Sequence, residues 1–351
     1  MNIKPLLIFF SFLFCSNLQA QDPYFAQFYT SPMQLNPAMI GVYEGQFRVA
    51  MNYREQWGSI LGTNPFRTIS ASFDARQQVG RGDYIGFAGS VLRDEAGTSN
   101  FTQNRVNLGV SFMKQLSGGR GYRGGAAQYL VAGAQAGIGQ NDFDVSGLWF
   151  SEQYDSENEA INFEAANGEA FDRNNTGIFP DLSAGILWYA LFDDNMSIYA
   201  GAGMYHINTP NISFLDGVVA NLNSRITAHV GGELPFNDNL SILPAAVVMK
   251  QGEAMNVIAG GNFRYTNRDW REVAVRIGGW AQFSNKLDNG VNNAHIIATA
   301  ILEMERWNVG ISYDLNANIT PATNARGAYE LSLIYTHPEK RRRGKIRCPK
   351  L

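Results

Sequence analysis

The sequence predicts an all-β protein, a transmembrane antiparallel β-barrel of about 14 strands with an N-terminal plug-like segment. Three observations predict this fold. Segments that alternate apolar and polar residues recur along the chain, aromatic residues lie near many predicted strand ends, and short and long connections alternate. The composition agrees, with 45% hydrophobic and 17% charged residues, 36 glycines and a mean hydropathy of -0.19. Such values suit strands that face lipid on one side and a wet lumen on the other.

Residues 1–20 have the features of a secretory signal peptide. Lys4 precedes an apolar run, residues 6–14, and Leu18-Gln19-Ala20 offers a cleavage site after Ala20. The apolar run is too short to span a bilayer as a helix. Removal of this peptide would leave Cys348 as the remaining cysteine, so the sequence predicts no internal disulfide.

Residues 21–45 form a short aromatic segment before the first predicted strand. Asp22 followed by Pro23 predicts a helix start, and Pro32 and Pro37 predict that no long helix follows. Burying a Phe-sized side chain is worth about 1.5–3 kcal/mol, so we expect the segment to pack inside the barrel or to cap its periplasmic mouth. The plug or hatch residues are expected to be Tyr24, Phe25, Phe28, Tyr29, Asn36, Pro37 and Ala38.

Residues 46–337 are expected to form the barrel. The segments of strand character number about 14, an even count, as expected of bacterial barrels. They are 46–56, 65–74, 83–93, 102–114, 127–139, 180–191, 195–207, 224–234, 239–250, 253–265, 272–283, 293–303, 305–315 and 327–336.

The alternation is clearest in segment 305–315. Trp307, Val309 and Ile311 fall on one face, and Ser312 and Asp314 on the other. This periodicity also fits a soluble sandwich of two sheets. A closed barrel is favoured because aromatic residues near strand ends suit interfacial girdles, and because closure leaves no exposed sheet edge.

The connection lengths predict the orientation. The long connections, 140–179, 208–223, 284–292 and 316–326, fall on one side, and most connections on the other side are tight. Outer-membrane barrels have long extracellular loops and short periplasmic turns. The connections near Gln251 and at 115–126 depart from this asymmetry. With an even strand count, both termini are expected in the periplasm.

The acidic loop, residues 140–179, is the longest connection and carries nine acidic residues against Arg173. A solvated surface loop is one interpretation. The other is a contact surface for a cationic partner, with Asp155, Glu157 and Glu159 as candidate contacts. The ligand spacing of a calcium loop is absent, so no metal site is predicted.

The basic tail, residues 338–351, differs in composition from the rest of the chain. Like charges at this density do not pack, so the tail is expected to be ordered by a partner, if at all. It would contact acidic machinery in the periplasm or bind anionic surfaces nonspecifically. A nucleic-acid partner is excluded by the signal peptide. The candidate contact residues are Arg341, Arg342, Arg343, Lys345 and Arg347.

The sequence predicts no enzyme and no cofactor. The four histidines are spread over different segments, and no nucleophile elbow, zinc motif or phosphate loop is present. His206 and His229 are expected to be girdle or lumen residues. The candidate lumen-facing ion-pair residues are Arg48, Arg54, Arg105, Arg276 and Glu272.

Four motifs carry a family resemblance. DPYFAQFY, then LNPAMIG, then NYREQWGS with SASFDA follow one another in order. This set resembles the PorP/SprF family of the Bacteroidota type IX secretion system, and the resemblance runs through the whole chain. It implies a non-enzymatic outer-membrane protein that acts with the secretion machinery. Its implied partners are outer-membrane lipid and a secreted adhesin, such as a gliding-motility filament, with a C-terminal sorting domain.

A second class of function stays open. The chain also resembles FadL-like channels for hydrophobic compounds, whose N-terminal hatch contains Asn-Pro-Ala. Asn36, Pro37 and Ala38 would then belong to a hatch. The lumen discriminates between the two, because a channel needs a continuous path and a docking protein does not.

Overall fold

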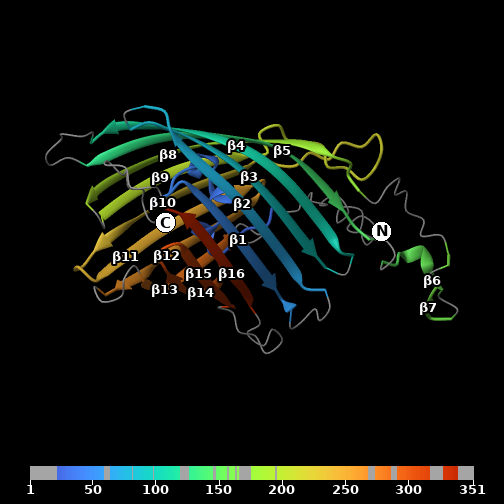
Figure 1. The fold of residues 1–351 in the computed structure, drawn as a ribbon. Helices are drawn as coiled ribbons and strands as arrows, with labels where there is room; N and C mark the ends of the chain where they lie inside the picture. The colour runs from blue at the N-terminus through green and yellow to red at the C-terminus, as the bar shows by residue number, and fades with distance from the viewer. Residues whose placement is uncertain are drawn as a thin grey trace, which may run out of the picture.

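The computed structural model shows a closed barrel of antiparallel strands (Figure 1). It describes residues 22–58, 64–80, 82–97, 99–118, 126–144, 148–155, 158–162, 164–165, 175–193, 196–267, 273–285, 291–316 and 327–338. The strand order around the barrel is β1-β16-β15-β14-β13-β12-β11-β10-β9-β8-β5-β4-β3-β2. Among the described residues, no helix is both long and apolar enough to cross a membrane.

The barrel strands are β1 (Phe47–Gln56), β2 (Phe66–Gln78), β3 (Tyr84–Ala96), β4 (Phe101–Ser117), β5 (Ala127–Asp142), β8 (Phe179–Asp193), β9 (Met196–Tyr205), β10 (Arg225–Pro235), β11 (Leu240–Gln251), β12 (Ala254–Thr266), β13 (Ala274–Asn285), β14 (Val291–Glu303), β15 (Trp307–Asn316) and β16 (Ala328–His337). Each segment that the sequence predicts overlaps one of these strands. The predicted fold class, an antiparallel barrel of 14 strands, is confirmed.

The strands alternate between lipid-facing and lumen-facing positions. Along β15, Val309 and Ile311 are exposed on the outer surface, whereas Ser312 and Asp314 are buried inside. The barrel closes where β1 pairs with β16, in an unbroken register from Phe47 opposite His337 to Gln56 opposite Ala328. Every barrel strand is thus paired on both sides, so the barrel has no free edge.

The two ends of the barrel differ. We call the end at which β1 and β5 finish the long-loop end, because the connections 143–178 and 206–224 lie there. We call the opposite end, at which β1 begins and β16 finishes, the turn end. Within the acidic loop, the short elements η3 (Ser151–Gln153), β6 (Tyr154–Asp155) and β7 (Ala160–Ile161) lie beyond the barrel wall (Figure 1). The sequence does not predict these three elements.

The amino-terminal segment, defined here as residues 22–45, contains three short helices. They are η1 (Phe28–Thr30), α2 (Pro32–Leu35) and η2 (Pro37–Met39). The predicted helix start at Asp22-Pro23 is wrong, because no helix begins there. Pro32 and Pro37 instead occupy the first positions of α2 and η2, where the missing N–H of proline costs nothing.

The apolar core lies inside the barrel, between the amino-terminal segment and the inner wall. One cluster joins Ala38, Met39 and Val42 to Tyr129, Leu187, Tyr189 and other inward side chains of β3, β4, β5, β8 and β9. A second joins Phe28, Tyr29 and Leu35 to Val247, Ile258, Trp280 and Ile297. These strands carry apolar residues on both faces, so the inner wall is less polar than a water-filled lumen requires.

Candidate functional site

The amino-terminal segment makes hydrogen bonds with strands all around the barrel. Its partners include Asn52 (β1), Asp74 (β2), Ser111 (β4), Gln135 (β5), Ile186 (β8), Tyr205 (β9), Thr227 (β10), Gln251 (β11), Gln282 (β13), Ser312 (β15) and Glu330 (β16). Since strands on all sides contact the same segment, it lies in the lumen, where Figure 1 shows it in dark blue.

The aromatic residues of this segment pack against one side of the lumen. Phe25, Phe28 and Tyr29 are buried. The ring of Phe28 meets Trp280 edge-on, with ring centroids 5.4 Å apart, and Tyr29 lies 5.5 Å from the same indole. Edge-to-face pairs of this kind add about 0.5–1.5 kcal/mol beyond the area that they bury. The aromatic residues therefore fix the segment to the β13 side of the wall.

The Asn36-Pro37-Ala38 turn is fixed by its own side chain and by the wall. The Asn36 amide oxygen accepts a hydrogen bond from the backbone N–H of Ala38 at 2.9 Å, and its nitrogen donates to the carbonyl of Ile186 at 2.9 Å. The turn lies directly against two glycines. A Cβ atom at Gly133 would lie 2.3 Å from the Pro37 carbonyl oxygen, and one at Gly185 would meet the Asn36 amide oxygen.

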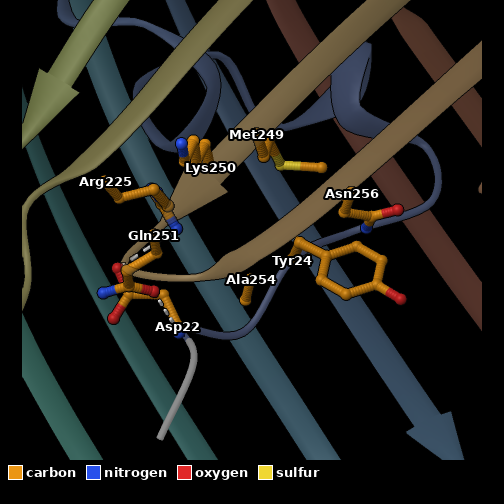
Figure 2. Close-up of a pocket in the computed structure, with 8 residues that line it drawn as sticks. All are labelled: Asp22, Tyr24, Arg225, Met249, Lys250, Gln251, Ala254 and Asn256. Atoms are coloured by element: carbon orange, nitrogen blue, oxygen red, sulfur yellow. Dashed lines mark hydrogen bonds and ion pairs between the residues drawn. The ribbon is translucent and has the colours of Figure 1, made fainter. Parts of the chain in front are cut away.

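Asp22 lies at the long-loop end. Its backbone N–H donates to Gln251, the last residue of β11, at 2.8 Å. It also lines a cavity of about 20 Å³ with Tyr24, Arg225, Met249, Lys250, Gln251, Ala254 and Asn256 (Figure 2). A cavity of this volume suits a single water molecule.

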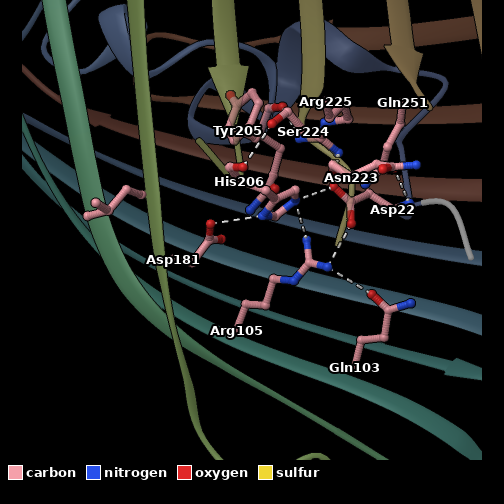
Figure 3. Close-up of polar contacts among 12 residues, drawn as sticks. Asp22, Gln103, Arg105, Asp181, Tyr205, His206, Asn223, Ser224, Arg225 and Gln251 are labelled. Atoms are coloured by element: carbon pink, nitrogen blue, oxygen red, sulfur yellow. Dashed lines mark hydrogen bonds and ion pairs between the residues drawn. The ribbon is translucent and has the colours of Figure 1, made fainter. Parts of the chain in front are cut away.

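The carboxylate of Asp22 is the centre of a buried ionic cluster (Figure 3). One oxygen accepts from Arg105 at 2.6 Å, and the other accepts from the His206 ring at 2.6 Å and lies 3.4 Å from Arg225. The second ring nitrogen of His206 lies 2.8 Å from a carboxylate oxygen of Asp181. A ring with a carboxylate at each nitrogen satisfies both bonds only when it is protonated.

The cluster shifts the protonation of its members. Burial alone would raise the pKa of Asp22, but Arg105, His206 and Arg225 hold it well below its usual value. Burial alone would lower the pKa of His206, but Asp22 and Asp181 raise it above its usual value. Asp22 therefore stays charged at neutral pH, and the two carboxylates favour the protonated form of His206. His206 also has a positive φ of 55°, uncommon for a residue with a Cβ, so the surrounding bonds hold it in place.

A second ionic group binds the middle of the segment to the seam of the barrel, the place where β1 pairs with β16. Glu330 on β16 accepts hydrogen bonds from the backbone N–H groups of Ala26 at 2.5 Å and Gln27 at 2.9 Å. It also pairs with Arg54 on β1, which in turn binds Asp314 at 2.6 Å. The carboxylate thus joins β16 to β1 and to the amino-terminal segment.

A third ionic group lies near the turn end. The guanidinium of Arg48 binds Asp74 at 2.8 Å, and Asp74 also accepts the backbone N–H of Gly41 at 2.8 Å. The Tyr43 hydroxyl lies within hydrogen-bond distance of two carbonyl oxygens, those of Gln46 and Asp74, and can donate its one hydrogen to either. The segment therefore reaches the turn end before it enters β1.

The structure places the residues predicted from the sequence as follows. Of the four predicted lumenal arginines, Arg48, Arg54 and Arg105 form the pairs above and Arg276 pairs with Glu303. Glu272 lies outside the described residues. His206 and His229 are buried inside the barrel. In the predicted plug, Asn36, Pro37 and Ala38 are buried and Tyr24 is half-buried.

The predicted partner contacts are described only in part. Asp155 is half-buried at the end of β6, where it accepts hydrogen bonds from Asn158, and Glu159 is exposed. Glu157 and the tail residues Arg341, Arg342, Arg343, Lys345 and Arg347 lie outside the described residues, as does the predicted signal peptide, residues 1–20.

Sequence reasoning missed the acidic members of the lumenal clusters. Asp22 was interpreted as a helix cap, and Asp181, Asp314 and Glu330 were not singled out. An acidic residue at an inward position of a predicted strand is a usable signal, because a buried carboxylate needs a partner. Asp314 and Glu330 carry this signal. Within the part of the chain that the structure describes, no cluster of three His, Cys, Asp or Glu side chains could hold a metal ion.

Comparison with known proteins completes the description. No curated protein matches the sequence. Among solved structures, the fold is similar to a mutant of the monoaromatic hydrocarbon channel TodX, with 11% identity over 85% of this chain and 91% of that chain and a TM-score of 0.46. It is also similar to the Pseudomonas putida toluene transporter TodX, with 13% identity over 90% and 94% and a TM-score of 0.43.

The KdgM porin, in complex with a disordered oligogalacturonate, is another similar structure, with 8% identity over 82% of this chain and 98% of that chain and a TM-score of 0.36. The sequence itself matches one family over residues 17–335, a span that includes all the barrel strands but the last two residues of β16. By this match the chain belongs to the PorP/SprF family of type IX secretion system membrane proteins.

Proposed function

We propose that this protein is a non-enzymatic docking component of type IX secretion, which holds a secreted adhesin at the cell surface through its long-loop end. The family associates the chain with type IX secretion. The observation that carries the proposal is the lumen, which the amino-terminal segment occupies with bonds to strands on all sides. A barrel closed in this way has its outer loops, rather than a central path, available for function.

The long-loop end has the charge that such a role uses. The exposed acidic residues described there include Glu152, Glu159, Glu164 and Asp216. Arg93, a basic residue exposed at the same end, is paired with Glu95, so its charge is balanced. An acidic face attracts a partner with a basic patch and raises its association rate. In the proposed orientation this end is extracellular and the turn end is periplasmic, since the long loops of outer-membrane barrels face outward.

The basic tail completes the proposal on the other side of the membrane. β16 ends at the turn end, so a tail that follows it starts in the periplasm. There Arg341, Arg342, Arg343, Lys345 and Arg347 would meet acidic surfaces of the secretion machinery. A FadL-like channel is not adopted as a second function, because the amino-terminal segment occupies the lumen with hydrogen bonds to strands on several sides.

Surface display of the secreted adhesin tests the docking role. Replacing Asp155 with Asn and Glu159 with Gln should lower the amount of adhesin on intact cells several-fold, because the acidic loop loses two of the negative charges that attract the basic partner. The matched control is Asp238→Asn, an exposed acidic residue in a turn at the turn end. Both proteins should keep their heat-modifiable mobility on gels. Equal display by the loop variant and the control would contradict docking through these residues.

A further inference from the structure

The amino-terminal segment runs through the lumen from one end of the barrel to the other. At its start, Asp22 contacts Arg225, the first residue of β10, and Gln251, the last residue of β11. Both positions belong to the long-loop end. At its finish, Tyr43 bonds to Gln46 and Asp74 at the turn end, where β1 begins. The segment is therefore an additional pass through the barrel, made inside the wall.

This pass changes the parity of the chain. An even number of strands places the start of β1 and the end of β16 at the same end, as the pairing of Phe47 with His337 shows. One more pass before β1 moves the start of the segment to the opposite end. We propose that Asp22 and the end of β16 face opposite sides of the membrane, with Asp22 presented among the long loops and His337 on the other side, in contrast to the expectation from strand count alone that both termini lie in the periplasm.

The start of the segment is fixed rather than loosely placed. Asp22 is bound through its backbone N–H and through both carboxylate oxygens. Arg225, one of its partners, also donates to the carbonyl of Gln34 at 3.2 Å and lies over the Tyr205 ring at 4.3 Å. Leaving a buried charge without its partner is strongly destabilising, so this end does not leave the cluster readily.

The residues next to this anchor remain within reach of the long-loop side. Pro23 and Tyr24 are half-buried, whereas the residues from Phe25 to Met33 are all buried. Lys250 lines the same cavity as Tyr24 (Figure 2). At the other end of the segment Glu44 is exposed. Pro23, which is half-buried, and Glu44 are thus two positions of one segment that keep contact with solvent and lie at opposite ends of the barrel.

The inference also enlarges the proposed docking face, and in this respect it rests on the proposed function. The loop 206–224, which begins with His206, carries exposed Leu215, Val218 and Val219. These side chains and the start of the amino-terminal segment lie at the same end. A secreted protein docked on the long loops would then contact an apolar surface and the amino-terminal end together.

Thiol labelling of two single-cysteine proteins tests the inference. Pro23→Cys and Glu44→Cys are each made with Cys348→Ser and retained only if the protein is heat-modifiable on gels. A membrane-impermeant maleimide is applied to intact cells and to permeabilised cells. The Pro23→Cys protein should react in intact cells, and the Glu44→Cys protein should react only after permeabilisation, with at least a ten-fold difference between the two in intact cells.

The other labelling patterns distinguish failure of the inference from failure of the proposed function. Labelling of both proteins on the same side, or no labelling of the Pro23→Cys protein under either condition, would overturn the inference. The inverse pattern, with only the Glu44→Cys protein labelled in intact cells, would keep the ends on opposite sides but reverse the orientation. That result would remove the extracellular docking face and so contradict the proposed function alone.

Discussion

The pKa of Asp22 is lowered and that of His206 is raised, so together they define a pH range in which their cluster stabilises the protein most. The Asp22 pKa is lowered, so its stabilisation is complete above the ordinary Asp pKa, about 3.9, and is lost as the pH falls through the lowered value. The His206 pKa is raised, so its stabilisation is complete below the ordinary His pKa, about 6.5, and is lost as the pH rises through the raised value.

We expect the cluster to stabilise the barrel most between about pH 4 and 6.5. Urea unfolding in detergent micelles, followed from pH 3 to 10, measures this. The His206→Gln protein should be less stable than wild type at pH 6 and should approach it above the raised His206 pKa. Subtracting the free energy of unfolding of one protein from that of the other cancels the contribution of the titrating groups that both proteins share. A difference that is constant over the whole range would contradict an ionic role for His206.

These residue-level contacts could be predicted from the sequence only in part. The inward positions of Arg48, Arg54 and Arg105 follow from strand alternation, and so does the expectation that they form internal ion pairs. The identity of each partner does not follow. Asp22 precedes Arg105 by 83 positions, and their contact depends on how the segment winds through the lumen.

At the level of elements, the barrel strands were predictable, whereas the local structure of the amino-terminal segment was not. A period of two in hydrophobicity is a local signal, so it locates every barrel strand within a few residues. The amino-terminal segment has no such period. Pro32 and Pro37 predict that no long helix forms, and α2 and η2 are indeed short. The sequence did not predict that each proline begins a helix, a position at which proline loses no hydrogen bond. The two-residue strands β6 and β7 are too short to leave a pattern.

The contact of the Asn36-Pro37 turn with β5 yields a prediction for that element. In the Gly133→Ala protein the added methyl group would lie 2.3 Å from the Pro37 carbonyl oxygen, so the turn must move away from the wall. We expect a loss of stability on the order of 1–3 kcal/mol. If the segment closes the lumen, as we propose, permeability to small solutes should also rise in a liposome-swelling assay.

The matched control is Gly279→Ala on β13, where an added Cβ meets nothing within 4 Å. It should leave both stability and permeability close to wild type. Equal stability and permeability of the two variants would show that the Asn36-Pro37 turn does not require a glycine at position 133. A loss of stability without a rise in permeability would separate packing of the segment from closure of the lumen.

At the scale of the whole molecule, the outer surface must match the bilayer. Ile311 lies in the middle of β15 and points outward with 54% of its surface exposed. The Ile311→Arg protein places a charge on the lipid-facing wall, which costs about 2–4 kcal/mol near the bilayer midplane. We expect this loss in urea unfolding measured in lipid vesicles.

Val219→Arg is the control, because Val219 is 71% exposed in the loop 206–224 and lies outside the barrel strands. This substitution should change stability by no more than about 0.5 kcal/mol. A comparable loss in both proteins would mean that the loop is immersed in lipid, and no loss in either would contradict a lipid-facing β15.

Glu330 has a consequence for the order of assembly. It lies on the last strand, yet it bonds to Ala26 and Gln27, 304 and 303 positions earlier in the chain, and to Arg54 on the first strand. Contacts of such long sequence separation form slowly, because the loop between them must first be closed. Seam closure and capture of the amino-terminal segment therefore share one carboxylate, and we expect both to be completed late in folding.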